Sequence, residues 1–167
     1  MQAWMRRLPL IGRRYREAIA PPGAWTGPAD GRRVLIEEDD GELRKAMAVA
    51  LHDAGFQTAE CAGPGTHGER RCPLVDGQGC DAVDRADAVL QVFVPSDEAM
   101  QDLRQAIHAH DPDKPIAVIT PALTARRHAD QLAGTTVSTE PLTRRGVVAT
   151  AEQAVTEKAI AEKAIAE

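Results

Sequence analysis

Aromatic side chains are scarce in this sequence. Its 167 residues include only two Phe, one Tyr and two Trp, or 3%, so a core of ordinary domain size must be built from aliphatic side chains. No run of about 18 apolar residues occurs, and no transmembrane helix is therefore predicted. The N-terminus also lacks the apolar segment of a secretory signal. With 43% hydrophobic and 27% charged residues, the composition is typical of a soluble globular protein.

Cysteine is nearly absent as well, and its count is odd. Three cysteines in a chain without a signal segment indicate a reduced, cytoplasmic setting rather than a disulfide framework. The net charge of −5 is unevenly distributed, because residues 1–33 carry seven Arg against Glu17 and Asp30. The remainder therefore carries about −10. So acidic a body is not expected to bind nucleic acid directly.

The first 20 residues predict a basic amphipathic helix. Most of the arginines lie away from one helical face, which is formed by apolar and aromatic residues at helical spacing. These residues are Trp4, Leu8, Ile11, Tyr15 and Ile19. Such a helix can lie on an anionic membrane surface or dock on an acidic partner. A helix packed on the chain's own acidic domain and a frayed terminus explain the same pattern. Residues 21–31 are rich in Pro and Gly and predict a linker.

From residue 32 onward, short apolar runs alternate with helical patterns. Strands are predicted at 33–37, 56–61, 87–94, 115–120 and 135–139, and helices at 42–55, 81–86, 97–110, 124–133 and from 141 onward. This alternation predicts an α/β fold, a doubly wound five-stranded parallel sheet of flavodoxin-like order 2-1-3-4-5 with helices on both faces. The most hydrophobic strand, 87–94, is expected at its centre. The domain is predicted to span 32–155, with a helical C-terminal extension over 156–167.

One stretch carries a family resemblance. The sequence VLIEEDDGELRKAMAVALHDAGFQTAEC, residues 34–61, resembles the beginning of a response-regulator receiver domain of bacterial two-component signalling. The resemblance covers about residues 33–155. In the first 28 of these the sequence motif itself is similar, and afterwards only the order of strands and helices is similar. It implies a signal-transduction module.

The resemblance also implies a site, from which this chain departs. In receivers, two acidic residues bind magnesium, an aspartate accepts the phosphoryl group, and a Thr or Ser and a Lys complete the site. The matching positions here hold Glu38 and Asp39, then Gln91, Thr120 and Glu140. Without the nucleophile and the lysine, phosphotransfer is not expected, and magnesium binding is expected to be weak or absent. We therefore expect a non-enzymatic pseudo-receiver that acts through protein–protein contact. The acidic cluster either holds a divalent cation weakly or is a family relic in a solvated crevice.

The loop over residues 61–80 is unusual for a receiver. It contains Cys61, Cys72 and Cys80, with His67 between the first two. These four residues can bind zinc, and the three thiolates can hold an iron–sulfur cluster. Alternatively, a pair of thiols forms a redox switch, or the cysteines are small buried residues with no ligand. A metal, iron–sulfur or thiol redox sensor is thus the alternative function. The other histidines are predicted to be surface or interface residues without matching partners: His52, His108, His110 and His128.

Overall fold

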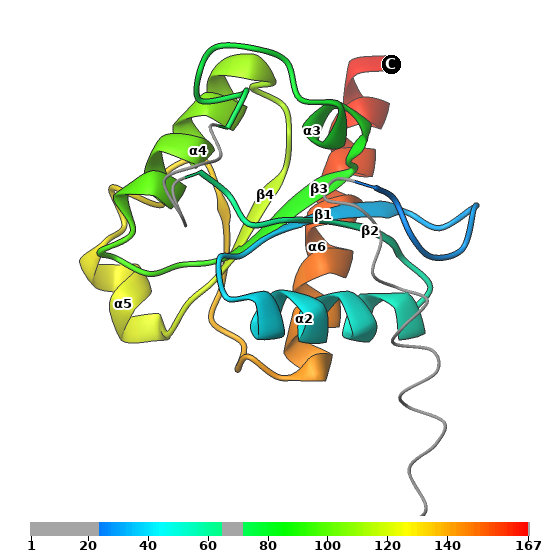
Figure 1. Ribbon diagram of the computed structural model, residues 1–167, viewed down its shortest axis with the longest axis horizontal. Helices are drawn as coiled ribbons and strands as arrows, with labels where there is room; N and C mark the ends of the chain where they lie inside the picture. The colour runs from blue at the N-terminus through cyan, green and yellow to red at the C-terminus, as the bar shows by residue number, and fades with distance from the viewer. Residues whose placement is uncertain (1–23, 65–71, 167) are drawn as a thin grey trace, which may run out of the picture.

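The computed structural model of the chain describes residues 24–64 and 72–166 (Figure 1). The predicted N-terminal helix and His67 lie outside the described residues. The strands are β1 (Arg33–Glu37), β2 (Gln57–Cys61), β3 (Ala88–Val92), β4 (Ile116–Ile119) and β5 (Thr136–Ser138). The helices are α2 (Gly41–Asp53), α3 (Asp81–Arg85), α4 (Glu98–His110), α5 (Ala122–Arg127) and α6 (Arg144–Ala166).

The strands form one parallel sheet in the order β2-β1-β3-β4-β5. This confirms the predicted topology and places β3 at the centre. The register aligns the carboxyl ends of three strands, because Glu37 is paired with Cys61 on one side and with Gln91 on the other. The crevice at the carboxyl ends is where proteins of this topology place their sites.

Two aliphatic clusters cover the two faces of the sheet. Alternating residues of β1 point to opposite faces, so that Val34 and Ile36 pack with α2 and α6, whereas Leu35 packs with α3 and α4. Figure 1 shows α2 and α6 together on one side of the sheet and α4 with α5 on the other. Phe56 and Phe93 are the aromatic residues in these clusters. The described core is thus aliphatic, as the composition predicts.

Helix α2 begins one residue before its predicted start and ends two residues before its predicted end. The Asp40 carboxylate accepts hydrogen bonds from the backbone N–H groups of Glu42 and Leu43, which would otherwise lack partners in the first turn. At the other end Gly55 has φ +88, a left-handed conformation that favours glycine. The acidic run after β1 thus leads directly into a capped helix.

Helix α5 is shorter than predicted. It ends at Arg127, and residues 128–134 are turns. The helix has no side-chain cap hydrogen bond and no buried residue, so little packing energy stabilises a longer form. The turns end at Gly134, which has φ +77 and lies against the His108 ring of α4.

Part of the predicted linker is attached to the sheet. Thr26 and Thr58 exchange two backbone hydrogen bonds, each of 2.8 Å, along the open edge of β2. His52 Nε2 lies 2.7 Å from Thr58 Oγ1 and 3.0 Å from Thr26 Oγ1. His52 therefore has partners, contrary to prediction. The attachment covers backbone groups that an edge strand otherwise exposes.

Helix α6 continues without interruption through the predicted domain boundary at residue 155. Among the α6 side chains whose burial is described, Val155 is the last buried one, and Ile160 beyond it is 65% exposed. None of the described helices is both long enough and apolar enough to cross a membrane.

Candidate functional site

The four consecutive carboxylates after β1 have four different environments. Glu37 is the last residue of the strand and is buried, and Glu38 is also nearly buried. Asp39 is exposed, whereas Asp40 caps α2. The cluster therefore does not converge on a common point. Within residues 24–64 and 72–166, no group of three or more His, Cys, Asp or Glu side chains is arranged to hold a metal ion.

A chain of buried polar side chains includes Gln91, the residue that the resemblance assigns to the phosphoacceptor position. Gln91, at the carboxyl end of β3, is fully buried, and its Nε2 donates a 2.7 Å hydrogen bond to Glu37 Oε2. Its Oε1 accepts a 3.1 Å hydrogen bond from Nη1 of Arg104 on α4. The amide thus bridges a carboxylate and a guanidinium that are themselves only 2% and 4% exposed.

Burial shifts the pKa values of the two ionisable side chains that Gln91 bridges. Loss of hydration raises the pKa of Glu37 to about 7, although the Gln91 hydrogen bond and the Arg104 charge oppose the shift. Burial likewise lowers the pKa of Arg104, against the charges of Asp97 and Glu37. The Arg104 guanidinium lies 5.2 Å from the centre of the Phe93 ring, a cation–π contact.

Sequence reasoning missed Glu37 and Arg104. The resemblance assigned the acidic pair to Glu38 and Asp39, but the structure places Glu37 beside Gln91. Strand pairing could have found it, because the last residue of β1 lies opposite the phosphoacceptor position. Arg104 interrupts the apolar stripe of Met100, Leu103 and Ile107 on α4, and an arginine on a buried stripe indicates a buried partner.

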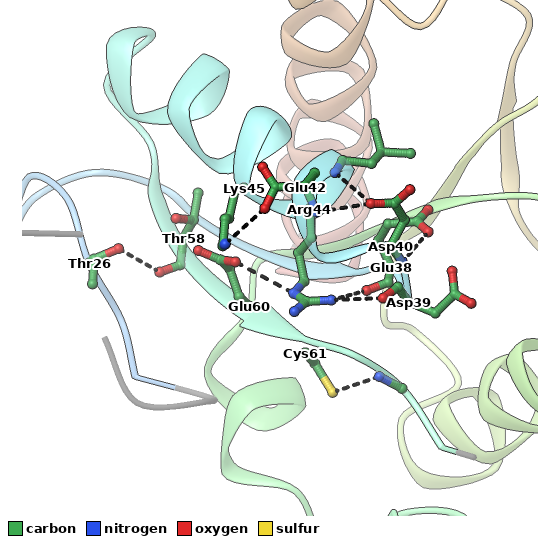
Figure 2. A network of polar contacts seen from close by, with 12 residues as sticks. Thr26, Glu38, Asp39, Asp40, Glu42, Arg44, Lys45, Thr58, Glu60 and Cys61 are labelled. Carbon is green, nitrogen blue, oxygen red and sulfur yellow. Dashed lines mark hydrogen bonds and ion pairs between the residues drawn. The ribbon is translucent and has the colours of Figure 1, made fainter. Parts of the chain in front are cut away.

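Glu38 and its neighbours interact mainly with local backbone (Figure 2). Glu38 Oε1 accepts a 3.0 Å hydrogen bond from the N–H of Asp40. Arg44 donates to the carbonyl oxygens of Glu38 and Asp39 and forms a 3.5 Å ion pair with Glu60. Burial, together with Asp39, raises the pKa of Glu38 to about 7. These contacts hold the loop between β1 and α2 in place.

The remaining receiver positions lie at the ends of β4 and β5. Thr120 is buried, its N–H donates to the carbonyl oxygen of Ser138, and its Oγ1 has no hydrogen-bond partner. Glu140 is exposed, and its N–H lies 3.4 Å from Ser138 Oγ. The structure therefore places an anionic side chain, not a cation, after β5.

All three cysteines are free, partly buried thiols that pack against the cluster on the α3 and α4 face. Cys61, paired with Glu37 in the sheet, accepts a hydrogen bond from the N–H of Gly63 at 3.3 Å. Burial and then the Glu37 charge raise the pKa of the Cys61 thiol to about 11. Such a thiol is protonated at neutral pH and is a poor nucleophile and metal ligand.

The other three histidines of the domain differ in their surroundings. His110 Nε2 lies 2.6 Å from Asp84 Oδ1 on α3. The His128 ring packs against Phe93 with ring centres 5.8 Å apart. His108 Nε2 is buried and has no hydrogen-bond partner.

Comparison with known structures defines the class of fold. A response regulator receiver protein from Sinorhizobium medicae is 14% identical, with a TM-score of 0.52 over 78% of this chain and 99% of that one. A response regulator receiver domain protein from Clostridium thermocellum is 14% identical, with a TM-score of 0.56 over 77% of this chain and 98% of that one. NtrX from Brucella abortus, whose structure was determined in complex with ADP, is 16% identical. Its TM-score is 0.60 over 80% of this chain and 29% of that one. No protein-family model matches the sequence, and comparison with curated proteins finds no match either.

The chain is thus an α/β protein of flavodoxin-like topology. More narrowly, its fold is that of the response-regulator receiver domains.

Proposed function

We propose that this protein is a non-enzymatic signalling module: a receiver scaffold that works through protein–protein contact and does not accept a phosphoryl group. The observation that carries the proposal is Gln91 at the carboxyl end of β3, fully buried between Glu37 and Arg104. A neutral amide is not a nucleophile toward phosphorus, and both ends of this one are already hydrogen-bonded. Magnesium prefers carboxylate oxygens, which this position does not offer.

Incubation with acetyl phosphate and magnesium should therefore leave the wild-type chain unmodified. Acyl phosphates are labile to hydroxylamine, so intact-mass measurement before and after hydroxylamine treatment identifies them. The matched variant Gln91→Asp supplies the missing carboxylate and serves as the comparison. A hydroxylamine-labile phosphate on the wild-type protein would contradict the proposal.

The best-supported contact surface lies on α5, β5 and α6. Within the described residues, the edge strand β5 pairs with β4 alone, so that no described strand covers its other backbone edge. Exposed apolar side chains lie on these elements: Leu123 on α5, Val137 on β5 and Ile160 on α6, with 52%, 37% and 65% exposure. An open strand edge beside exposed apolar residues favours a protein partner that packs there.

A photo-crosslinking amino acid placed at Val137 should capture one discrete protein from the cells that produce the chain. The matched control is the same amino acid at Asp113, which is exposed in the turn between α4 and β4. The Asp113 position should give no product of that mass. Equal labelling from both positions would show that the surface around β5 is not specific.

A further inference from the structure

A crevice of about 310 Å³ lies where the loops after β1, β2 and β3 meet the first turn of α4. Most of its wall is apolar, and the apolar lining residues are Ala62, Pro64, Val94, Ala99 and Met100. Val94 is 49% exposed although its side chain is apolar. An exposed apolar side chain at the edge of a hollow favours a segment that packs over it.

The charged side chains of the crevice wall are both carboxylates. They belong to Asp39 and Asp97, and none of the described residues that line the crevice is a cation. Asp97 is held at the start of α4, where its Oδ1 accepts a 3.0 Å hydrogen bond from the N–H of Met100. The charge of Arg104 acts on Asp97 from the interior, but its guanidinium is engaged by Gln91. Negative charge beside an apolar wall suits an arginine, whose alkyl stem packs on apolar surface while its guanidinium pairs with carboxylates.

The connection to residues 1–23 lies on the crevice side of the sheet. Thr26 pairs with Thr58 in the antiparallel direction along the outer edge of β2. A segment antiparallel to β2, followed backwards from Thr26, runs toward the carboxyl end of β2. The described chain therefore begins beside the loops that form the crevice.

Residues 1–23 carry a charge opposite to that of the crevice. Their charged side chains are five arginines and Glu17, which gives +4 as five minus one. The nearest of these arginines are Arg13, Arg14 and Arg16, 8 to 11 positions upstream of the first described residue. Eight extended residues span up to about 26–29 Å. The two strand spacings from β2 across β1 to β3 amount to only about 10 Å, so these arginines can reach the crevice.

We propose that residues 13–19 dock in this crevice of their own chain. The arginines of the segment pair with Asp39 and Asp97, and Tyr15 covers Val94. Because the segment is tethered to the domain, its effective concentration is on the order of millimolar, which compensates for the weakness of exposed ion pairs. A docked segment excludes other ligands from the carboxyl-end crevice, where proteins of this topology place their sites. The contact is therefore autoinhibitory, and it goes beyond the proposed function because it does not involve the surface on α5, β5 and α6.

A photo-crosslinking amino acid in place of Val94, in the full chain, tests the contact. On illumination it should form a crosslink to residues 13–19 of the same chain, which mass spectrometry of the digested monomer identifies. The matched control is the same amino acid at Ile160, which is exposed on α6 beyond the last described buried residue of that helix. The Ile160 position should give no such crosslink. The reciprocal placement at Tyr15 should label residues 94–100.

Charge variants show whether the arginines hold the segment in place. Because exposed ion pairs are individually weak, Arg13→Gln, Arg14→Gln and Arg16→Gln are combined, and the crosslink yield from Val94 should fall about fivefold or more. The control is the double variant Arg6→Gln and Arg7→Gln, which should keep the wild-type yield. Circular dichroism should be the same for all of these proteins, because the substitutions lie outside the domain.

Absence of a crosslink between Val94 and residues 13–19 would overturn the inference, and so would an equal yield in the triple variant. A crosslink from Val94 to residues 65–71 alone would assign the crevice to that segment instead. A product found only in crosslinked dimers would assign it to a second copy of the chain, and either result overturns the inference. Acetyl phosphate labelling and crosslinking from Val137 do not depend on residues 13–19, so failure here is distinguishable from failure of the proposed function.

Discussion

Replacement of Arg104 by alanine is expected to lower the free energy of unfolding by about 3–5 kcal/mol, because a large buried side chain and its charged hydrogen bond are lost together. The guanidinium is 4% exposed, donates to Gln91 Oε1 and packs on Phe93. Its loss leaves that oxygen without a partner, removes a positive charge that favours the ionised form of Glu37 and opens a cavity. Denaturant unfolding followed by circular dichroism measures the change. The adjacent, exposed Gln105→Ala should change stability by less than about 0.5 kcal/mol.

A combined variant separates the charge from the packing. It combines three apolar substitutions, Glu37→Leu, Gln91→Leu and Arg104→Met. Together they replace all three side chains of the buried polar network, so that none of the three is left with an unmatched hydrogen-bonding group. Because apolar replacement of a whole buried network is often neutral or stabilising, the triple variant should be more stable than Arg104→Ala alone. If Arg104→Ala lowers the free energy of unfolding by less than about 1 kcal/mol, the buried guanidinium does not stabilise the protein through Gln91.

The sheet was predictable because its signals are local. The strands β1, β3 and β4 are short and mostly apolar runs, the main helices have apolar stripes, and Asp40 and Gly55 mark the ends of α2. The strand order followed from the resemblance and the alternation of elements. Helix α5 was overestimated because the apolar residue that continues its pattern, Leu132, is buried from a segment of turns and not from a helix.

The site was less predictable because its contacts join distant segments. Glu37 and Gln91 are 54 residues apart, and His52 reaches Thr26 across 26 residues. The motif identified Gln91 as the phosphoacceptor position but could not show that its amide bridges Glu37 and Arg104. The resemblance drew attention to Glu38 and Asp39, whereas the side chain that contacts Gln91 belongs to Glu37.

The stability of the protein should fall as pH rises from about 4.5 to about 7. Glu37 has a pKa of about 7 in the folded chain against an ordinary value of 4.5. Between these values the unfolded chain releases its proton first, so ionisation favours unfolding. The stabilisation by protonated Glu37 is fully present below pH 4.5. It decreases as the pH rises and is lost above about pH 7. For Glu37 alone the loss is about 3 kcal/mol, at about 1.4 kcal/mol for each pKa unit.

Glu37→Gln should remove this dependence. The glutamine keeps an oxygen that accepts from Gln91 Nε2 but cannot ionise, so the variant and the wild type should have similar stability at pH 5. At pH 8 the variant should be more stable by about 2–3 kcal/mol. Glu38, whose pKa is raised in the same direction, leaves part of the slope in both proteins. The exposed Glu42→Gln is the matched control and should follow the wild type. Parallel curves for Glu37→Gln and wild type would mean that Glu37 is not the buried acid that titrates, and that the polar chain is held by Arg104 and Gln91 alone.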